Sequence, residues 1–156
     1  MDVNPLGLVP MLFENEALIA LLVFAGTAVV VALWMPGFLL PIAASSGAML
    51  SLWLAAAAVA CGALVGSMAV FAMSRYFLSD HVPFRIARFL KRFEAPFGAH
   101  GAWFVLVLRL GGAPHALVSA SSALMPIRAS SFAMATLVGM SPAIILAAAT
   151  GAAIAG

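Results

Sequence analysis

Charged side chains are scarce in this sequence. Of its 156 residues, 8% are charged and 65% are hydrophobic, whereas about a quarter of the residues in a soluble domain are charged. Uncharged runs extend from Ala17 to Ser74 and from Ala129 to Gly156. Because a helix needs roughly 20 apolar residues to cross a bilayer, the composition excludes an ordinary soluble domain. It predicts an all-α integral membrane protein with about four to six membrane segments.

Cysteine and the usual catalytic patterns are also missing. Cys61 is the only cysteine, which excludes an internal disulfide and a cysteine-based metal site. The sequence has no GxSxG, no HExxH, no paired carboxylates and no glycine-rich phosphate loop. His115 has serines nearby but no acid placed to orient it as in a triad. We therefore expect no enzyme activity, no cofactor and no metal.

The basic residues are concentrated in one segment. All of them except Arg109 and Arg128 lie between Arg75 and Arg92, which is typical of a membrane-flanking loop and does not indicate nucleic acid binding. Within it, Pro83–Phe93 reads as an amphipathic segment that lies against anionic head groups. Its basic face consists of Arg85, Arg88, Lys91 and Arg92.

The stretch from Leu108 to Met125 differs from the oily sequence around it. It combines Arg109, helix-breaking residues, a histidine and several serines. An arginine at membrane depth is costly and indicates a functional site. The alternative is that Arg109 extends to the membrane surface. We favour a binding site for an anionic head group, because the charge coincides with the helix breakers. Its candidate residues are Arg109, Gly111, Gly112, Pro114, His115, Ser119, Ser121 and Ser122.

A second interruption lies near the N-terminus. Pro36-Gly37 divides Ala17–Met35 from the short apolar segment Phe38–Met49, which favours a re-entrant helix pair that contributes Pro36 and Gly37 to the site. An ordinary transmembrane hairpin with a tight turn is the alternative. The nearby acids Glu14 and Glu16 are candidates for a counter-ion of Arg109 or a proton carrier, or else they simply face water.

Two longer segments, Ser51–Met73 and Ala129–Gly156, read as spanning helices. Each has a face of small residues at a spacing of four, which suits close helix packing. Gly62 and Gly66 mark the first face, and Gly139 and Gly151 mark the second. We expect these two faces to pack against each other.

The two halves of the chain follow the same order of elements. Ala44–Met49 reads ASSGAM and Ala120–Met125 reads ASSALM, and each copy precedes a spanning helix. We predict an inverted repeat of two broken, re-entrant hairpins, each followed by a spanning helix, within one membrane domain over 1–156. Repeat 1 covers about 14–74, the amphipathic loop about 75–100, and repeat 2 about 101–156. If both hairpins return to their own side, every basic residue except Arg109 lies on one side, which the positive-inside rule makes cytoplasmic.

Several short motifs resemble those of the DedA/VTT family, also called the SNARE-associated Golgi protein family. The chain looks most similar to the branch typified by a yeast late-Golgi vesicle protein. The similarity covers roughly 14–151. Its motifs are Pro36-Gly37 with Leu39-Leu40 and Gly47; Gly66-Ser67 with Phe71 and Ser74-Arg75-Tyr76; and Arg109-Leu110 with Pro114, Phe132, Thr136, Gly139-Met140 and Pro142.

The chain also departs from the family pattern. Phe38 and Ser67 stand where the family often has acids, His115 stands near the place of a second arginine, and Ser119 and Ala123 stand near an asparagine and a glycine. The missing carboxylates put proton-coupled transport in question.

The resemblance implies movement of phospholipid or polyprenyl-phosphate head groups between leaflets, with membrane lipids as partners and a multi-pass location in the plasma (inner) membrane. The alternative is a scaffold or assembly protein that forms a homo-oligomer through its small-residue faces.

Overall fold

The computed structural model describes residues 15–35, 37–77 and 100–155. Within these ranges the chain forms six helices and no strands, which confirms the predicted all-α class. Two of the helices, α4 and α7, are long and apolar enough to span a membrane. The six helices are α2 (Glu16–Ala32), α3 (Leu39–Met49), α4 (Leu52–Phe77), the helix His100–Leu110, α6 (His115–Ala123) and α7 (Ala129–Ala155). Pro36, Glu14, Arg85, Arg88, Lys91 and Arg92 lie outside the described residues.

The helix bounds differ from the predicted segments mainly at two ends. α2 ends at Ala32 and not at Met35, and α4 continues to Phe77, beyond the predicted end at Met73. Arg75 is therefore helical, and the prediction that it begins the loop is wrong. The sequence pattern misled because a polar pair after an apolar run looks the same whether the helix ends or continues. Pro142 lies inside α7 without ending it.

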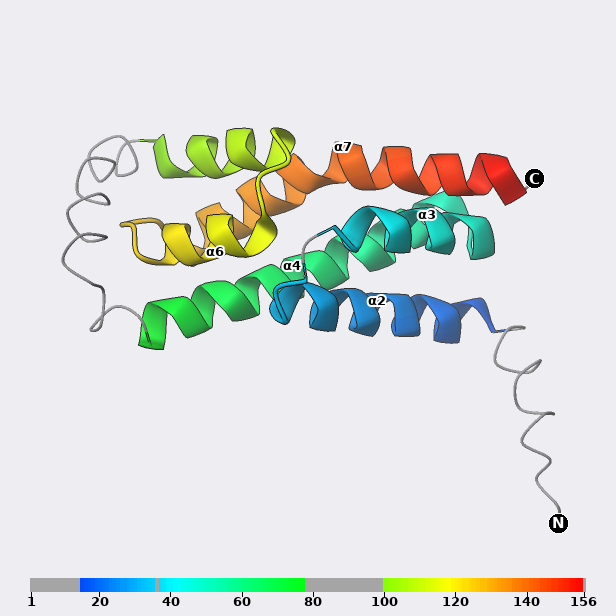
Figure 1. Ribbon diagram of the computed structural model, residues 1–156, viewed down its shortest axis with the longest axis horizontal. Coiled ribbons are helices and arrows are strands. Elements are labelled where there is room, and N and C mark those ends of the chain that lie inside the picture. Colours follow the sequence, from blue (N-terminus) through cyan, green and yellow to red (C-terminus); the bar gives the residue numbers. More distant parts are fainter. Residues whose placement is uncertain (1–14, 36, 78–99, 156) are drawn as a thin grey trace, which may run out of the picture.

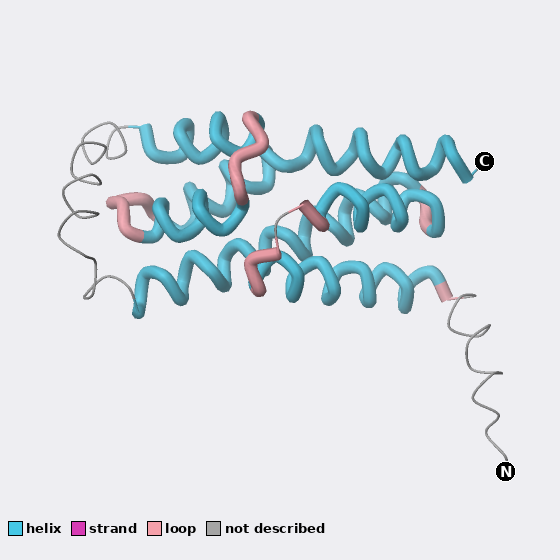
Figure 2. Tube along the Cα trace, viewed as in Figure 1, coloured by secondary structure: helices cyan, strands magenta, loops and turns pink. Residues whose placement is uncertain are grey.

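The helices form two pairs that turn back near the middle of the molecule (Figure 1). α2 and α3 come from one end and turn, and the helix His100–Leu110 and α6 do the same from the opposite end. α4 and α7 run along most of the length beside them. The turns appear as short loops near the centre in Figure 2. They need left-handed backbone at Gly37 (φ 88°), Gly112 (φ 74°) and Trp34 (φ 61°), which explains the glycines at two of these positions.

Small residues allow the helices to approach closely, but with different partners from those predicted. A Cβ on Gly62 would lie 2.4 Å from the carbonyl oxygen of Phe24 in α2, and a Cβ on Gly151 would lie 1.8 Å from that of Ala44 in α3. The first small-residue face therefore packs on α2, whereas on the second face Gly151 packs on α3 and Gly139 packs on the helix His100–Leu110. The prediction that the two faces pack against each other is wrong, because α2 covers Gly62 and α3 covers Gly151.

Two large clusters of buried apolar side chains, and a smaller third one around Ile19, Leu50, Ala55 and Ala148, fill the interior of the described part of the chain. One large cluster joins α2, α3, α4 and α7 through residues such as Val31, Leu39, Val59 and Ile144. The other large cluster joins α4, α6, α7 and the helix His100–Leu110, and its members include Phe71, Val105, Val118 and Phe132. The two turns lie where these two large clusters meet.

Candidate functional site

Arg109 is buried in the last turn of the helix His100–Leu110, with 5% of its surface exposed. Its Nη2 donates to Ser119 Oγ at 2.9 Å and lies 3.4 Å from Ser67 Oγ. Its Nη1 donates to Nδ1 of His115. Side chains from α4 and α6 therefore hold the guanidinium from two sides.

The groups that contact Arg109 are neutral. Arginine has only donors, so His115 Nδ1 accepts in this contact and the imidazole carries its proton on Nε2. Ser119 Oγ accepts from Arg109 and donates to the carbonyl oxygen of His115 at 2.8 Å. These hydrogen bonds position the guanidinium without neutralising its charge.

α7 supplies the third wall around Arg109. The Cζ of Arg109 lies 5.9 Å from the centroid of the Phe132 ring, within the range of a cation–π contact. A Cβ on Gly139 would lie 2.6 Å from the Cβ of Arg109. Gly139 therefore leaves the space that the base of the arginine side chain occupies. From the sequence, Gly139 was predicted only as a helix-packing residue.

No carboxylate faces Arg109 within 15–35, 37–77 and 100–155. Glu16 is the only acid in these ranges, and it is exposed in the first turn of α2. Arg109 lies near the other end of that helix, because Val30 and Val31 of α2 line the same pocket as Arg109. At 1.5 Å per residue, Glu16 is about 20 Å away along the helix axis. The prediction that Glu16 is a counter-ion of Arg109 is therefore wrong, and Glu14 lies outside the described residues.

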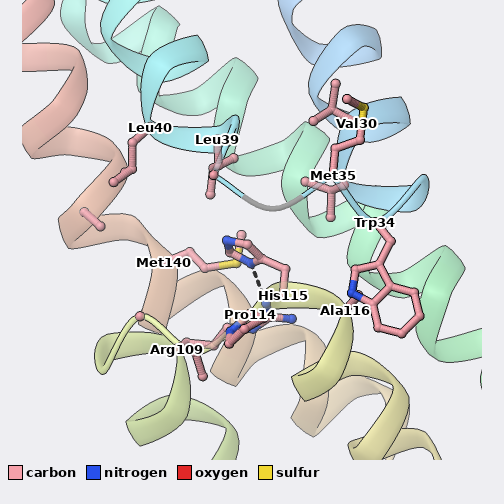
Figure 3. Close-up of a pocket in the computed structure, with 15 residues that line it drawn as sticks. Val30, Trp34, Met35, Leu39, Leu40, Arg109, Pro114, His115, Ala116 and Met140 are labelled. Carbon is pink, nitrogen blue, oxygen red and sulfur yellow. Dashed lines mark hydrogen bonds between the residues drawn. The ribbon is translucent and has the colours of Figure 1, made fainter.

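Arg109 and His115 form one wall of a pocket of about 260 Å³. Figure 3 shows them across the cavity from Val30 and Trp34 of the first helix pair. Both turns contribute to the lining, together with Met140 of α7. The lining residues are Val30, Val31, Trp34, Met35, Gly37, Leu39, Leu40, Arg109, Gly112, Ala113, Pro114, His115, Ala116, Met140 and Ala143. The pocket is thus apolar apart from the guanidinium, the imidazole and the backbone of the turns.

Three buried polar atoms have no hydrogen-bond partner among the described residues: Arg109 Nε, Ser122 Oγ and Thr136 Oγ1. Thr136 lies on α7 between Phe132 and Gly139, the two residues of that helix that contact Arg109. Because buried polar groups are normally paired, Arg109 Nε and Thr136 Oγ1 indicate unused hydrogen-bonding capacity where α7 packs on Arg109.

The structure brings together only part of the predicted site. Gly37, Gly112, Pro114 and His115 line the pocket with Arg109, and Ser119 contacts Arg109 directly. Gly111 is exposed, and its N–H donates to the carbonyl oxygen of Val107. Ser121 donates to the carbonyl oxygen of Leu117 in its own helix, and Ser122 is buried away from the pocket.

Sequence reasoning did not assign two residues that the structure connects to this region, Ser67 and Trp34. Ser67 follows Gly66 on a face that looked purely structural, and only its alignment with an acid of the family marked it. Trp34 precedes the helix-breaking pair and has the unusual positive φ, which the sequence does not reveal.

Arg75 was also assigned differently, as part of the basic loop. Its Nε donates to the carbonyl oxygen of Ala123 at 3.0 Å, and its Nη2 donates to those of Met125 at 2.9 Å and Ile127 at 3.0 Å. These carbonyls lie at and just after the end of α6, where the helix itself leaves them unpaired. Arg75 therefore ties α4 to the C-terminal end of α6.

An aromatic pair connects the two arginines. The rings of Phe71 and Phe132 are stacked, with centroids 4.5 Å apart. The Cζ of Arg75 lies 4.6 Å from the Phe71 centroid, while Arg109 lies over Phe132. The two guanidinium groups are thus linked through one stacked pair.

The family model of the VTT domain matches residues 35–153, which include both turns, Arg109 and most of the pocket. The chain belongs to the VTT-domain (DedA) family. It is accordingly a membrane protein, with α4 and α7 as its candidate spans. No match was found among curated proteins or among solved structures. The pocket of this VTT-domain protein therefore has to be interpreted from its own residues.

Proposed function

We propose that this VTT-domain protein moves lipids with anionic, phosphate-bearing head groups between the two leaflets of a membrane. The observation that carries the proposal is a buried arginine that faces a pocket without any acid beside it in the described part of the chain. A buried charge is normally paired or hydrogen-bonded, and the guanidinium geometry suits phosphate oxygens. The positive charge is therefore available to a ligand.

The neutral groups around Arg109 support the same ligand. The Nε2–H of His115 is a second donor near the pocket. A phosphate oxygen accepts from such donors, whereas an ammonium group finds no carboxylate among the described residues that line the pocket. The surrounding Leu39, Leu40 and Met140 suit the first carbon atoms of the lipid tails.

The arrangement of the helices provides the route in this proposal. In our interpretation the two turning pairs are re-entrant hairpins of an inverted repeat, which enter from opposite leaflets and meet at the pocket. Two observations support it: the pairs come from opposite ends of the molecule (Figure 1), and both turns line the pocket. Broken backbone at this depth is tolerated because it lines a cavity.

The orientation and the membrane belong to the same proposal. Arg75 lies in the last turn of α4, Arg128 directly precedes α7, and the other basic residues except Arg109 fall between these helices in the sequence. The positive-inside rule then makes the segment 75–100 cytoplasmic, and the family resemblance suggests the plasma (inner) membrane. The resemblance to the yeast Golgi branch extends the proposal to phospholipid scrambling, next to the transport of polyprenyl-phosphate carriers.

The scaffold alternative has no observation in its favour. It relied on free small-residue faces, but Gly62 and Gly66 are covered by α2, and Gly151 is covered by α3. Contacts within the chain account for these residues, so a partner helix is not needed to explain them.

The test is a head-group flip assay on purified protein in phosphatidylcholine vesicles with a trace of acyl-labelled phosphatidylglycerol. We expect Arg109→Gln to slow the movement of the labelled lipid at least about tenfold, the effect of losing one charge-assisted hydrogen bond of about 1.5 kcal/mol. Arg128→Gln, which removes an exposed arginine at the start of α7, is the matched control and should flip lipid at the wild-type rate.

Thermal unfolding of both variants separates a loss of function from a loss of fold. If folded Arg109→Gln protein flips lipid as fast as the wild type, the guanidinium does not bind the head group and the proposal fails.

A further inference from the structure

The contact between α4 and α6 continues from the Arg109 site toward the end of α6. Ser119 contacts Arg109 in the middle of α6, and Ser122 follows one turn later. On α4, Ser67, Phe71 and Arg75 follow each other at intervals of one turn. Both rows begin at Arg109 and end where Arg75 holds the carbonyl of Ala123. We call this contact, from Ser67 and Ser119 to Ser122 and Arg75, the seam.

Ser122 is an unusual buried serine. It has no exposed surface, and its hydroxyl has no partner among the described residues. An unpaired buried hydroxyl lowers the stability of the fold. A helical serine can avoid this cost by bonding to its own helix, as Ser119 and Ser121 do at 2.8 and 2.6 Å. The hydroxyl of Ser122 is instead left unpaired, one turn beyond Ser119 on α6.

The repeated motif provides a direct comparison. Ser46 occupies the same place in ASSGAM as Ser122 does in ASSALM. Ser46 is also buried, but its hydroxyl donates to the carbonyl oxygen of Ala43 at 3.0 Å. The repeat therefore does not force an unpaired hydroxyl at this position, and the unpaired hydroxyl is found in the second copy, on α6.

Arg75 closes the seam at its far end. Its partners are backbone carbonyls, which are neutral acceptors, and no carboxylate pairs with it in the part of the chain that the structure describes. A guanidinium binds a phosphate more strongly than it binds a carbonyl. A phosphate can thus replace the carbonyl oxygens of α6 as the partner of Arg75, provided that α6 moves away from α4.

We propose that the seam is a second binding position for the anionic head group, with Ser122 and Arg75 as its polar groups. This inference rests on the proposed function. The structure has the first position open, at the pocket beside Arg109, and the second one closed by the Arg75 contacts and the Phe71–Phe132 stack. When α6 separates from α4, the phosphate passes from Arg109 past the free hydroxyl to Arg75.

The test compares two single variants, Ser122→Ala and Ser46→Ala, in thermal unfolding and in the flip assay described above. Ser122→Ala removes a hydroxyl that has no partner, so the melting temperature should stay the same or rise. Head-group movement should nevertheless slow about tenfold, as expected for the loss of one hydrogen bond to a charged group. Ser46→Ala removes a paired hydroxyl, so its melting temperature should fall slightly while the flip rate stays at the wild-type value.

The opposite pattern overturns the inference. If Ser122→Ala flips lipid at the wild-type rate while Arg109→Gln is slow, the seam is not part of the route, but the proposed function stands. If Ser122→Ala is slow and also melts at a lower temperature, its hydroxyl is structural and the inference also fails. If Arg109→Gln is as fast as the wild type, the proposed function itself fails, and the second position fails with it.

Discussion

A carboxylate placed beside Arg109 should compete with the lipid phosphate. Ser67 is the natural position, because its Oγ lies 3.4 Å from Arg109 Nη2 and its side chain is fully buried. In Ser67→Asp the two opposite charges would be about 4 Å apart, where their attraction is about 4 kcal/mol at an effective dielectric constant of about 20. Desolvation of the new carboxylate offsets part of this gain. If half remains, about 2 kcal/mol, the affinity for an anionic head group falls about thirtyfold.

The assay is lipid flip in the vesicles described above, with Ser67→Asn as the matched control. Asparagine has nearly the same size and shape as aspartate but no charge, so any effect of crowding in this buried place appears in both variants. We expect Ser67→Asp to be much slower than Ser67→Asn. Equal rates for the two variants would refute the argument that the uncompensated charge of Arg109 binds the lipid.

Two further predictions concern stability and are measured by thermal unfolding in detergent. Gly151→Ala should lower stability by roughly 1–3 kcal/mol, because the new Cβ would lie 1.8 Å from a carbonyl oxygen of α3. Gly26→Ala, where nothing lies within 4 Å, should be neutral or stabilising; a similar loss in both would contradict the packing argument. Arg75→Gln should cost roughly 1.5–3 kcal/mol, since it removes charge-assisted bonds to three carbonyls at the end of α6. Arg128→Gln, at an exposed arginine, should stay within about 0.5 kcal/mol of the wild type. Equal melting temperatures for Arg75→Gln and Arg128→Gln would contradict the stabilising role of the Arg75 contacts.

Local chemistry made the breaks in the helices predictable. Glycine and proline act on the backbone next to them, so the interruptions at Pro36-Gly37 and at Gly111–Pro114 could be located from the sequence alone. α3 and α6 indeed begin just after them, at Leu39 and His115. Arg109 was recognisable for a similar reason, since a single charge in an oily segment is costly wherever the segment packs.

The choice of helix neighbours was not predictable in the same way. A face of small residues shows that something packs closely, but not which helix does so. The spacing of small residues around Gly62 and Gly151 would suit any neighbouring helix. That Gly62 packs on α2 and Gly151 packs on α3 depends on contacts between distant parts of the chain.

Arg75 shows the same limit. Arg75 at the end of an apolar run has the pattern of an ordinary flanking charge, and only the position of α6 makes it a cap for three carbonyls. Glu16 shows the converse, because it was considered for the site by its nearness in sequence although α2 carries it to the opposite end.

Arg109 is fixed by side chains from α4, α6 and α7 rather than by any single element. The position of its guanidinium group therefore depends on where each of these three helices lies. Changes in bilayer thickness or lateral pressure that tilt one of these helices would alter the reach of the guanidinium without touching a pocket residue. For the proposed binding of an anionic head group, the affinity would then depend on the bilayer as well as on the pocket residues.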